Sequence, residues 1–196
     1  MVTPTPRQNT LALNQDLQRL LLVTLAAAAY YGTFRLNQHL DPWVLYGQGI
    51  ALVFLPAGIK HVAILVARGW GALGCFAALM WLSFEFWHGI AASQAALYSG
   101  LSTLASWAGI WIGMRLLGIA SDLENLRFIH LPLLDLITTA VHGFVVNAYF
   151  IAVGMKQQEL LANALAMMFG DYAGSFIVLT CLWLCLLVLR RLQRTN

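Results

Sequence analysis

Apolar residues occur along the chain in long blocks, and short polar segments separate these blocks. A helix needs roughly 20 predominantly apolar residues to cross the hydrocarbon core of a bilayer, and most of the blocks approach or exceed that length. Six membrane-spanning helices are therefore predicted, over residues 18–34, 44–67, 72–88, 91–117, 131–154 and 160–189. The last block is longer than a bilayer requires, so we expect it either to be tilted or to break near Gly170 and Gly174. The pattern predicts an all-α integral membrane protein, with one transmembrane domain (18–189) between a polar tail (1–17) and a basic tail (190–196).

Charged residues are scarce in the chain as a whole. Only 10% of the 196 residues are charged, against about 25% in a typical soluble domain, so the polar surface is too small for a soluble globule. The predicted helices leave no room for a separate kinase, nuclease or binding domain. The net charge of +3 is small and scattered, which argues against nucleic acid as a partner and leaves the lipid bilayer as the expected surroundings.

The basic residues fall mainly on one side of the predicted helices. With both termini in the cytoplasm, the outer side holds only Arg35 and Lys156. The cytoplasmic side then collects Arg7, Arg19, Arg68, Arg115, Arg127, Arg190, Arg191 and Arg194. Because positive charge favours the cytoplasmic side of a membrane, the sequence predicts that both termini are cytoplasmic. Five or seven spans would weaken this bias.

Small residues form stripes suited to helix packing. Lipid gives helices no hydrophobic reason to associate, so residues that allow close backbone contact drive packing in a membrane. In the fourth predicted span such residues recur every three or four positions, which keeps them on one helical face. This set is Ser99, Ser102, Ser106, Gly109 and Gly113. Gly170 and Gly174 form a second small-residue pair, and we assign both sets to helix packing.

The fifth predicted span carries a polar stripe. Asp135, Thr138, Thr139 and His142 stand at positions i, i+3, i+4 and i+7, and therefore share one face. A carboxylate and an imidazole on one face can share a proton, bind a cation or hold a polar ligand between helices. In the alternative interpretation, Asp135 lies at the cytoplasmic interface and His142 donates one hydrogen bond to a neighbouring helix.

Asp171 lies in an apolar run that is otherwise uncharged. A carboxylate at bilayer depth costs at least about 2.5 kcal/mol, so it marks a functional site by default and needs a partner. Ser175, one turn further on, can supply a hydroxyl, and Lys60 can supply a charge across the bundle. We therefore expect Asp171 to belong to a site or to a polar network in the core.

Two further pairs of ionisable residues lie within or beside the spans. Lys60 and His61 follow a proline and a glycine, which are expected to kink the second span and open a cavity. Lys60 could instead extend its ammonium to an interface. Glu85 and His88 stand one turn apart near the outer end of the third span, where they either belong to a site or lie in water.

Recognised catalytic and metal-binding motifs are absent from the sequence. It contains no HExxH, GxSxG, P-loop or paired-cysteine zinc pattern. The three histidines at depth, His61, His88 and His142, have no pair with diagnostic metal spacing. We therefore assign no catalytic residue, no metal and no cofactor.

Three short segments resemble the first class of MASE-type membrane sensor domains. These are Pro56–Ile59 (a P-x-G-I segment), the basic turn Arg68–Trp70 that follows an apolar stretch, and Gly170–Gly174 (Gly-Asp-x-x-Gly). Members of that family usually have more spans and usually feed a histidine kinase or diguanylate cyclase domain. The resemblance therefore implies a sensory membrane module that passes its output to a separate partner, since the chain ends at Asn196.

These observations predict a non-enzymatic sensory or ligand-binding module in a bacterial-type cytoplasmic (inner) membrane. The expected partners are a membrane protein or a second copy of the chain, with a possible small-molecule ligand. The substrate-binding subunit of a vitamin-type transporter has similar size and six spans, although the first span lacks a clear Ala-xxx-Ala coupling face. An accessory subunit of a larger membrane complex would use the small-residue face of the fourth span. An enzyme comes last among the alternatives.

Overall fold

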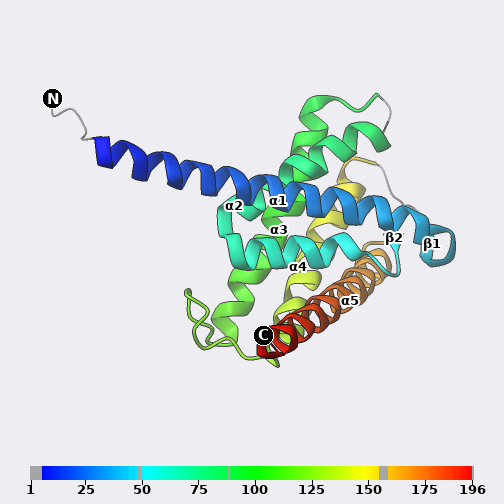
Figure 1. Ribbon diagram of the computed structural model, residues 1–196. Helices are drawn as coiled ribbons and strands as arrows, with labels where there is room; N and C mark the ends of the chain where they lie inside the picture. The colour runs from blue at the N-terminus through cyan, green and yellow to red at the C-terminus, as the bar shows by residue number, and fades with distance from the viewer. Residues whose placement is uncertain (1–5, 48–49, 88, 155–158, 196) are drawn as a thin grey trace.

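The computed structural model describes residues 6–47, 50–87, 89–154 and 159–195. Its elements are α1 (Pro6–Val44), β1 (Leu45–Gly47), β2 (Ile50–Ala51), α2 (Leu55–Phe86), α3 (Ala92–Leu116), α4 (His130–Ala152) and α5 (Leu160–Thr195) (Figure 1). Of the residues that the structure describes, 84% are helical, which confirms the predicted helical class. Among the described helices, α2, α4 and α5 are long and apolar enough to cross a membrane. The prediction of six spans is not confirmed, because α1 and α3 are not in this group.

Helix α2 turns sharply at Arg68 (Figure 1). Arg68 has a non-helical backbone (φ 53°, ψ −129°) that divides the helix into two limbs, 55–67 and 69–86. Just beyond the bend, Gly71 lies so close to the carbonyl oxygen of Ala63 that a Cβ atom would overlap it. Only glycine fits there. The bend falls between the two helices that the sequence predicts over 44–67 and 72–88.

The segment before α2 differs from the prediction. Residues 45–47 and 50–51 form the antiparallel strands β1 and β2, and α2 begins only at Leu55, so the predicted helix over 44–54 is wrong. Pro56 consequently stands in the first turn of α2, where its missing N–H costs nothing, and it does not kink a span. The Leu55 N–H donates instead to Asn37 Oδ1 of α1 at 2.8 Å.

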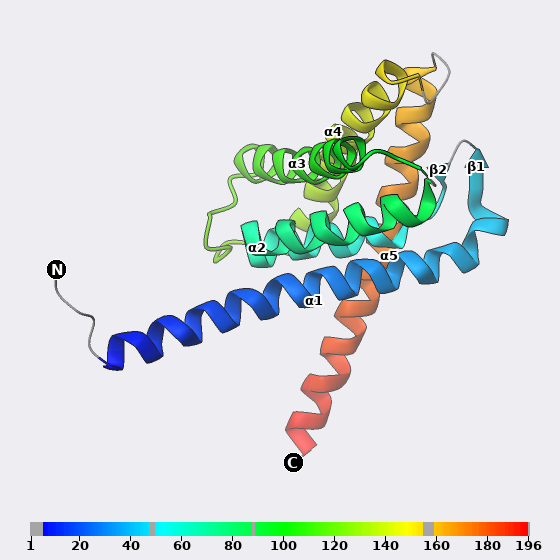
Figure 2. The same ribbon diagram turned by 90° about the horizontal axis from the view of Figure 1, so that it is seen from above.

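Successive helical segments run in opposite directions between two ends of the molecule. At the end that we call the loop end, the Arg68 guanidinium donates a hydrogen bond to the Ser121 carbonyl in the α3–α4 connection. The opposite, hairpin end contains β1 and β2, and there the rings of Trp87, Tyr98 and Phe150 are in contact. Helix α1 lies along α2 in both views (Figures 1 and 2), and Tyr30 packs in a buried cluster with residues 75–82 of the second limb.

Close backbone contacts hold α3 against α4. A Cβ atom added at Gly109 would overlap the Thr138 backbone, and one at Gly113 would overlap the Leu134 side chain. The serines of the same stripe are also buried, at positions 99, 102 and 106. The face that the sequence assigns to packing therefore lies in the α3–α4 interface.

Helix α5 approaches the backbone that precedes α2 equally closely. A Cβ at Gly170 would overlap the carbonyl oxygen of Ala51, and one at Gly174 would overlap that of Phe54. The Phe54 N–H also donates to the Gly170 carbonyl at 3.0 Å. Helix α5 runs without a break across both glycines for 36 residues, about 54 Å at 1.5 Å per residue. The break that the sequence allowed at Gly170 does not occur.

Candidate ligand-binding site

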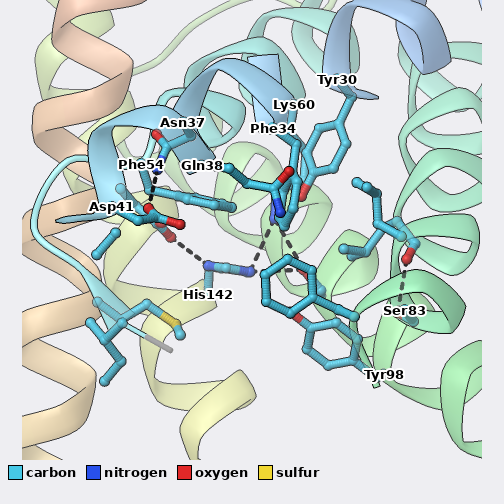
Figure 3. Close-up of a pocket in the computed structure, with 18 of the residues that line it drawn as sticks. Tyr30, Phe34, Asn37, Gln38, Asp41, Phe54, Lys60, Ser83, Tyr98 and His142 are labelled. Atoms are coloured by element: carbon cyan, nitrogen blue, oxygen red, sulfur yellow. Dashed lines mark hydrogen bonds and ion pairs between the residues drawn. The ribbon is translucent and has the colours of Figure 1, made fainter. Parts of the chain in front are cut away.

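Four polar side chains from four different helices meet in the interior. Lys60 comes from the first limb of α2, Ser102 from α3, His142 from α4 and Asp171 from α5. His142 is central: its Nδ1 lies 2.6 Å from Asp171 Oδ2, and its Nε2 lies 2.9 Å from Ser102 Oγ and 3.0 Å from Lys60 Nζ (Figure 3). Lys60 Nζ also lies 3.1 Å from Ser102 Oγ. We call these four residues the central cluster.

Burial of the charged side chains of the central cluster costs free energy unless those side chains are paired. Lys60 is 1% exposed and Asp171 is 2% exposed. An isolated charge away from water carries a penalty of several kcal/mol, so buried charges require partners and hydrogen bonds. The bundle supplies both, and the cluster ties α2, α3, α4 and α5 together.

The hydrogen-bond roles follow from the partners of His142. Its Nδ1 faces a carboxylate, which only accepts, so Nδ1 carries the hydrogen and Nε2 presents a lone pair. That single lone pair accepts from the Ser102 hydroxyl or from the Lys60 ammonium, and both lie within reach. Lys60 has three N–H donors, so donors remain for a further acceptor beside it.

The central cluster forms one wall of a cavity of about 300 Å³. This volume is at the lower end of the range for small-molecule sites. Aromatic rings make up much of the remaining lining, from Tyr30, Phe34, Phe54, Phe86, Trp87, Tyr98 and Phe150. Tyr98 stacks on Phe150 with 5.3 Å between ring centroids, and Trp87 meets Tyr98 edge-on at 4.9 Å. Flat walls of this kind suit a planar ligand.

One side of the cavity is polar and partly open. Asn37, Gln38 and Asp41 of α1 contribute to its lining, and Gln38 and Asp41 are partly exposed. Asn37 donates to Asp41 Oδ1 at 3.1 Å, which orients the carboxylate. These residues form a hydrophilic rim beside the aromatic walls (Figure 3).

A second histidine–carboxylate pair lies apart from the central cluster. His61 Nδ1 is 2.5 Å from Asp135 Oδ1 and 3.3 Å from Ser175 Oγ. His61 and Asp135 line a separate cavity of about 30 Å³, which has room for about one water molecule. Within the described residues His61 Nε2 has no hydrogen-bond partner. The predicted polar stripe of α4 is thus divided, with His142 at the large cavity and Asp135 at the small one.

The two threonines of that stripe form hydrogen bonds within their own helix. Thr138 Oγ1 donates to the Leu134 carbonyl at 2.8 Å, and Thr139 Oγ1 donates to the Leu136 carbonyl at 3.1 Å. Both residues are fully buried, and neither lines the large cavity. Their hydroxyls therefore donate hydrogen bonds within α4 and not to the large cavity.

Glu85 belongs to a different contact. Its carboxylate lies 2.5 Å from Arg35 Nη2 and accepts a hydrogen bond from Trp81 Nε1 at 2.8 Å. This pair joins α1 to the second limb of α2, and Glu85 does not line the large cavity. His88, which the sequence groups with Glu85, lies outside the described residues.

Ser102 is the member of the central cluster that sequence reasoning places in a packing stripe. It shares its face with Ser99 and Ser106, and spacing alone gives no reason to separate it from them. The aromatic lining was likewise missed, because rings such as Tyr98 and Phe150 come together only through the fold. Among the described residues, no group of three or more His, Cys, Asp or Glu side chains is placed to hold a metal ion.

Comparison of the chain with protein-family models, curated proteins and solved structures finds no match in any of the three.

Proposed function

We propose that the chain is an integral membrane ligand-binding module of a sensory type. It takes a small, neutral, planar molecule with a carbonyl oxygen into the cavity, and it passes the resulting change in helix packing to a separate membrane partner. The observation that supports this proposal is that one charged cluster both faces the cavity and joins four helices. A ligand that competes for those hydrogen bonds acts on all four helices at once.

The charges around the cavity favour a neutral ligand. Lys60 contributes one positive charge, and Asp171 and Asp41 contribute two negative charges. An anion would meet an acidic lining, and a cation would meet the Lys60 ammonium. A carbonyl oxygen accepts the spare Lys60 N–H without adding charge. The aromatic walls then enclose the apolar body of the ligand.

The signal would travel through a limited set of contacts. The Lys60 donors are shared among Ser102, His142 and the ligand, so binding changes how α2 is held to α3 and α4. A ligand shifts an equilibrium between two packings only by its differential affinity for them. Helix α5, which carries Asp171 and extends beyond the bundle (Figure 2), is the element best placed to reach a partner.

The proposal includes six crossings with both termini in the cytoplasm of a bacterial-type inner membrane. It is supported by the alternating directions of α1, the two limbs of α2, and α3 to α5. Polar residues lower the mean hydropathy of α3, yet Ser99, Ser102 and Ser106 are buried inside the bundle.

To test this topology, single cysteines replace exposed Ser93 and Ser121 in a chain without native cysteines. Ser93→Cys is expected to react with an impermeant maleimide from outside, and Ser121→Cys only after permeabilisation; the reverse pattern would refute the orientation.

The resemblance to MASE-type sensor domains agrees with a sensory role. Its Pro56–Ile59 and Gly170–Gly174 segments lie in adjoining parts of one close contact between α2 and α5: a Cβ at Gly174 would overlap Leu55 N, just before Pro56, and a Cβ at Gly58 would overlap Ser175 Cα, just after Gly174. Asp171 thus belongs to the segment that packs on the start of α2. This contact brings Lys60 and Asp171 to one cavity, so both segments would contribute to the same site.

Ligand class is tested with three naphthalenes of similar shape added to the purified chain in detergent. 2-Acetylnaphthalene has a carbonyl and no charge, 2-ethylnaphthalene lacks the carbonyl, and 2-naphthoate is an anion. We expect saturable binding and a raised Tm, followed by circular dichroism, with 2-acetylnaphthalene, and much weaker effects with the other two. Equal effects of all three, or no saturable effect of any, would refute the proposed ligand chemistry.

A further inference from the structure

We infer that the central cluster is also a catalytic site, in which Ser102 attacks the carbonyl carbon of an ester bound in the cavity. His142 is the general base, and Asp171 orients it. This inference rests on the proposed function in one respect, because it requires the cavity to admit carbonyl compounds. It adds a reaction: the hydrolysis of small, apolar esters inside the membrane.

The order of contacts is that of an activated hydroxyl nucleophile. Ser102 Oγ lies 2.9 Å from His142 Nε2, and His142 Nδ1 lies 2.6 Å from Asp171 Oδ2. A nucleophile within reach of a base, and a base oriented by a third group, recur on unrelated folds and are identified by geometry, not by sequence position. Here the three groups come from α3, α4 and α5, and all three line the 300 Å³ cavity.

Lys60 supplies the remaining requirement, a positive charge where an oxyanion develops. Its Nζ lies 3.1 Å from the Ser102 oxygen that would bond to the carbonyl carbon. A cation or N–H donor directed at that region stabilises the tetrahedral intermediate. Lys60 and Ser102 both lie within reach of the Nε2 lone pair of His142 and compete for it. A bound carbonyl oxygen draws Lys60 toward itself and leaves Nε2 free to accept the Ser102 proton.

The reaction balances without an oxidant or reductant. Ser102 Oγ forms a bond to the carbonyl carbon as its proton moves to His142 Nε2, and the carbonyl becomes an oxyanion beside Lys60. The intermediate collapses, the bond between the carbonyl carbon and the alkoxy oxygen breaks, and the alcohol leaves with the proton from Nε2. Water then attacks the carbonyl carbon of the ester that the acyl group forms with Ser102, and gives one proton to Nε2. The bond between that carbon and Ser102 Oγ breaks, Oγ takes the proton back from Nε2, and a carboxylic acid is released. One ester and one water yield one acid and one alcohol.

The lining also suits both water entry and product release. The rim residues Asn37, Gln38 and Asp41 offer water a polar path into an otherwise aromatic cavity. A product carboxylate would face the negative charges of Asp171 and Asp41, whereas the neutral ester would not. The site therefore holds the substrate better than the acid that it forms.

An alkyl fluorophosphonate carrying biotin tests the nucleophile directly on the full chain in detergent. Attack by Ser102 forms an Oγ–P bond, breaks the P–F bond and releases fluoride, and mass spectrometry of peptides locates the adduct. We expect an adduct on Ser102, none in Ser102→Ala, and labelling at least about 100-fold slower in His142→Gln and Asp171→Asn. The matched control is Ser106→Ala, one turn along the same buried face and outside the cavity lining, which is expected to label at the normal rate. Labelling elsewhere, or a rate that does not respond to His142→Gln, would overturn the inference.

Hydrolysis and binding are then measured on the same samples. 2-Naphthyl acetate releases fluorescent 2-naphthol when hydrolysed, and 2-acetylnaphthalene reports binding without reaction. Ser102→Ala is expected to bind 2-acetylnaphthalene and to lose hydrolysis of 2-naphthyl acetate. If the native chain binds 2-acetylnaphthalene but neither labels nor hydrolyses, the catalytic inference is wrong and the proposed binding function stands. If it labels at Ser102 but does not bind 2-acetylnaphthalene, the catalytic inference stands and the proposed ligand chemistry fails.

Discussion

His142 Nδ1 lies 2.6 Å from Asp171 Oδ2, and this contact joins α4 to α5 in the interior of the bundle. The other nitrogen of the same imidazole lies within hydrogen-bond distance of both Ser102 Oγ and Lys60 Nζ, so one ring on α4 contacts side chains from three other helices. A buried network of this kind is costly when only partly satisfied. Substitution of its members should therefore strongly affect both stability and function.

Asp171→Asn should destabilise the chain by about 3–5 kcal/mol, because it removes the one carboxylate of the central cluster and leaves the buried Lys60 charge uncompensated within that cluster. The free energy of unfolding in detergent, followed by circular dichroism, measures this loss. Glu159→Gln is the control, since Glu159 is exposed just before α5, and a surface change of this kind should stay within about 0.5 kcal/mol. Equal tolerance of both substitutions would contradict a paired Asp171.

The double variant Lys60→Met with Asp171→Asn should be more stable than Asp171→Asn alone. Methionine replaces the ammonium with an apolar group of similar length, so no uncompensated charge stays buried, and such replacements are often neutral or stabilising. A double-mutant cycle on the free energy of unfolding isolates the coupling. Additive losses would show that Lys60 and Asp171 do not interact.

The chemistry of this site was partly predictable from the sequence. A charge in an apolar run is costly wherever the helix lies, so Lys60 and Asp171 were candidates before any fold was known. Ser102 was not, because it shares spacing and residue type with Ser99 and Ser106, and only the position of His142 on α4 selects it. Helical periodicity reports which face a residue occupies, not which residue it meets.

The boundaries of the helices were also predictable only in part. The predicted helix over 91–117 ends within one residue of α3 at each terminus, because polar or glycine-containing segments flank a long apolar block. The predicted helix over 44–67 fails at its start, where Ile50 and Ala51 are buried in a strand. A short apolar run fits a buried strand as well as a helix, so hydropathy alone could not separate them.

Gly174→Ala should destabilise the chain by about 1–3 kcal/mol, as overpacking does in a close-packed interior. Its Cβ would overlap the Phe54 carbonyl, which is backbone and cannot rotate away. Gly100→Ala is the matched control on α3, where the added methyl would meet only a Phe76 side-chain atom at 4.0 Å. Gly100→Ala should be neutral or stabilising by up to about 1 kcal/mol. Equal changes in the free energy of unfolding would contradict the close approach of α5.

Arg68→Gly should be more stable than Arg68→Ala by about 1 kcal/mol, because glycine adopts the positive φ at the bend of α2 with less strain. Both variants lose the guanidinium contact with Ser121, so their difference reports the backbone alone. At Arg19, in the interior of α1, alanine should instead be more stable than glycine by about 1 kcal/mol. The same order at both positions would show that the bend carries no strain.

Lys60→Met should weaken 2-acetylnaphthalene binding at least about tenfold, because a hydrogen bond to a charged donor contributes about 1.5–3 kcal/mol. Glu85→Gln should leave the Kd unchanged, because Glu85 pairs with Arg35 and does not line the cavity. Both dissociation constants come from titration of the purified variants in detergent, with folding checked by circular dichroism. A Kd that moves with Glu85 but not with Lys60 would place the carbonyl contact at the α1–α2 pair. The two charges lie on opposite limbs of α2, so the comparison tests which limb presents the binding group.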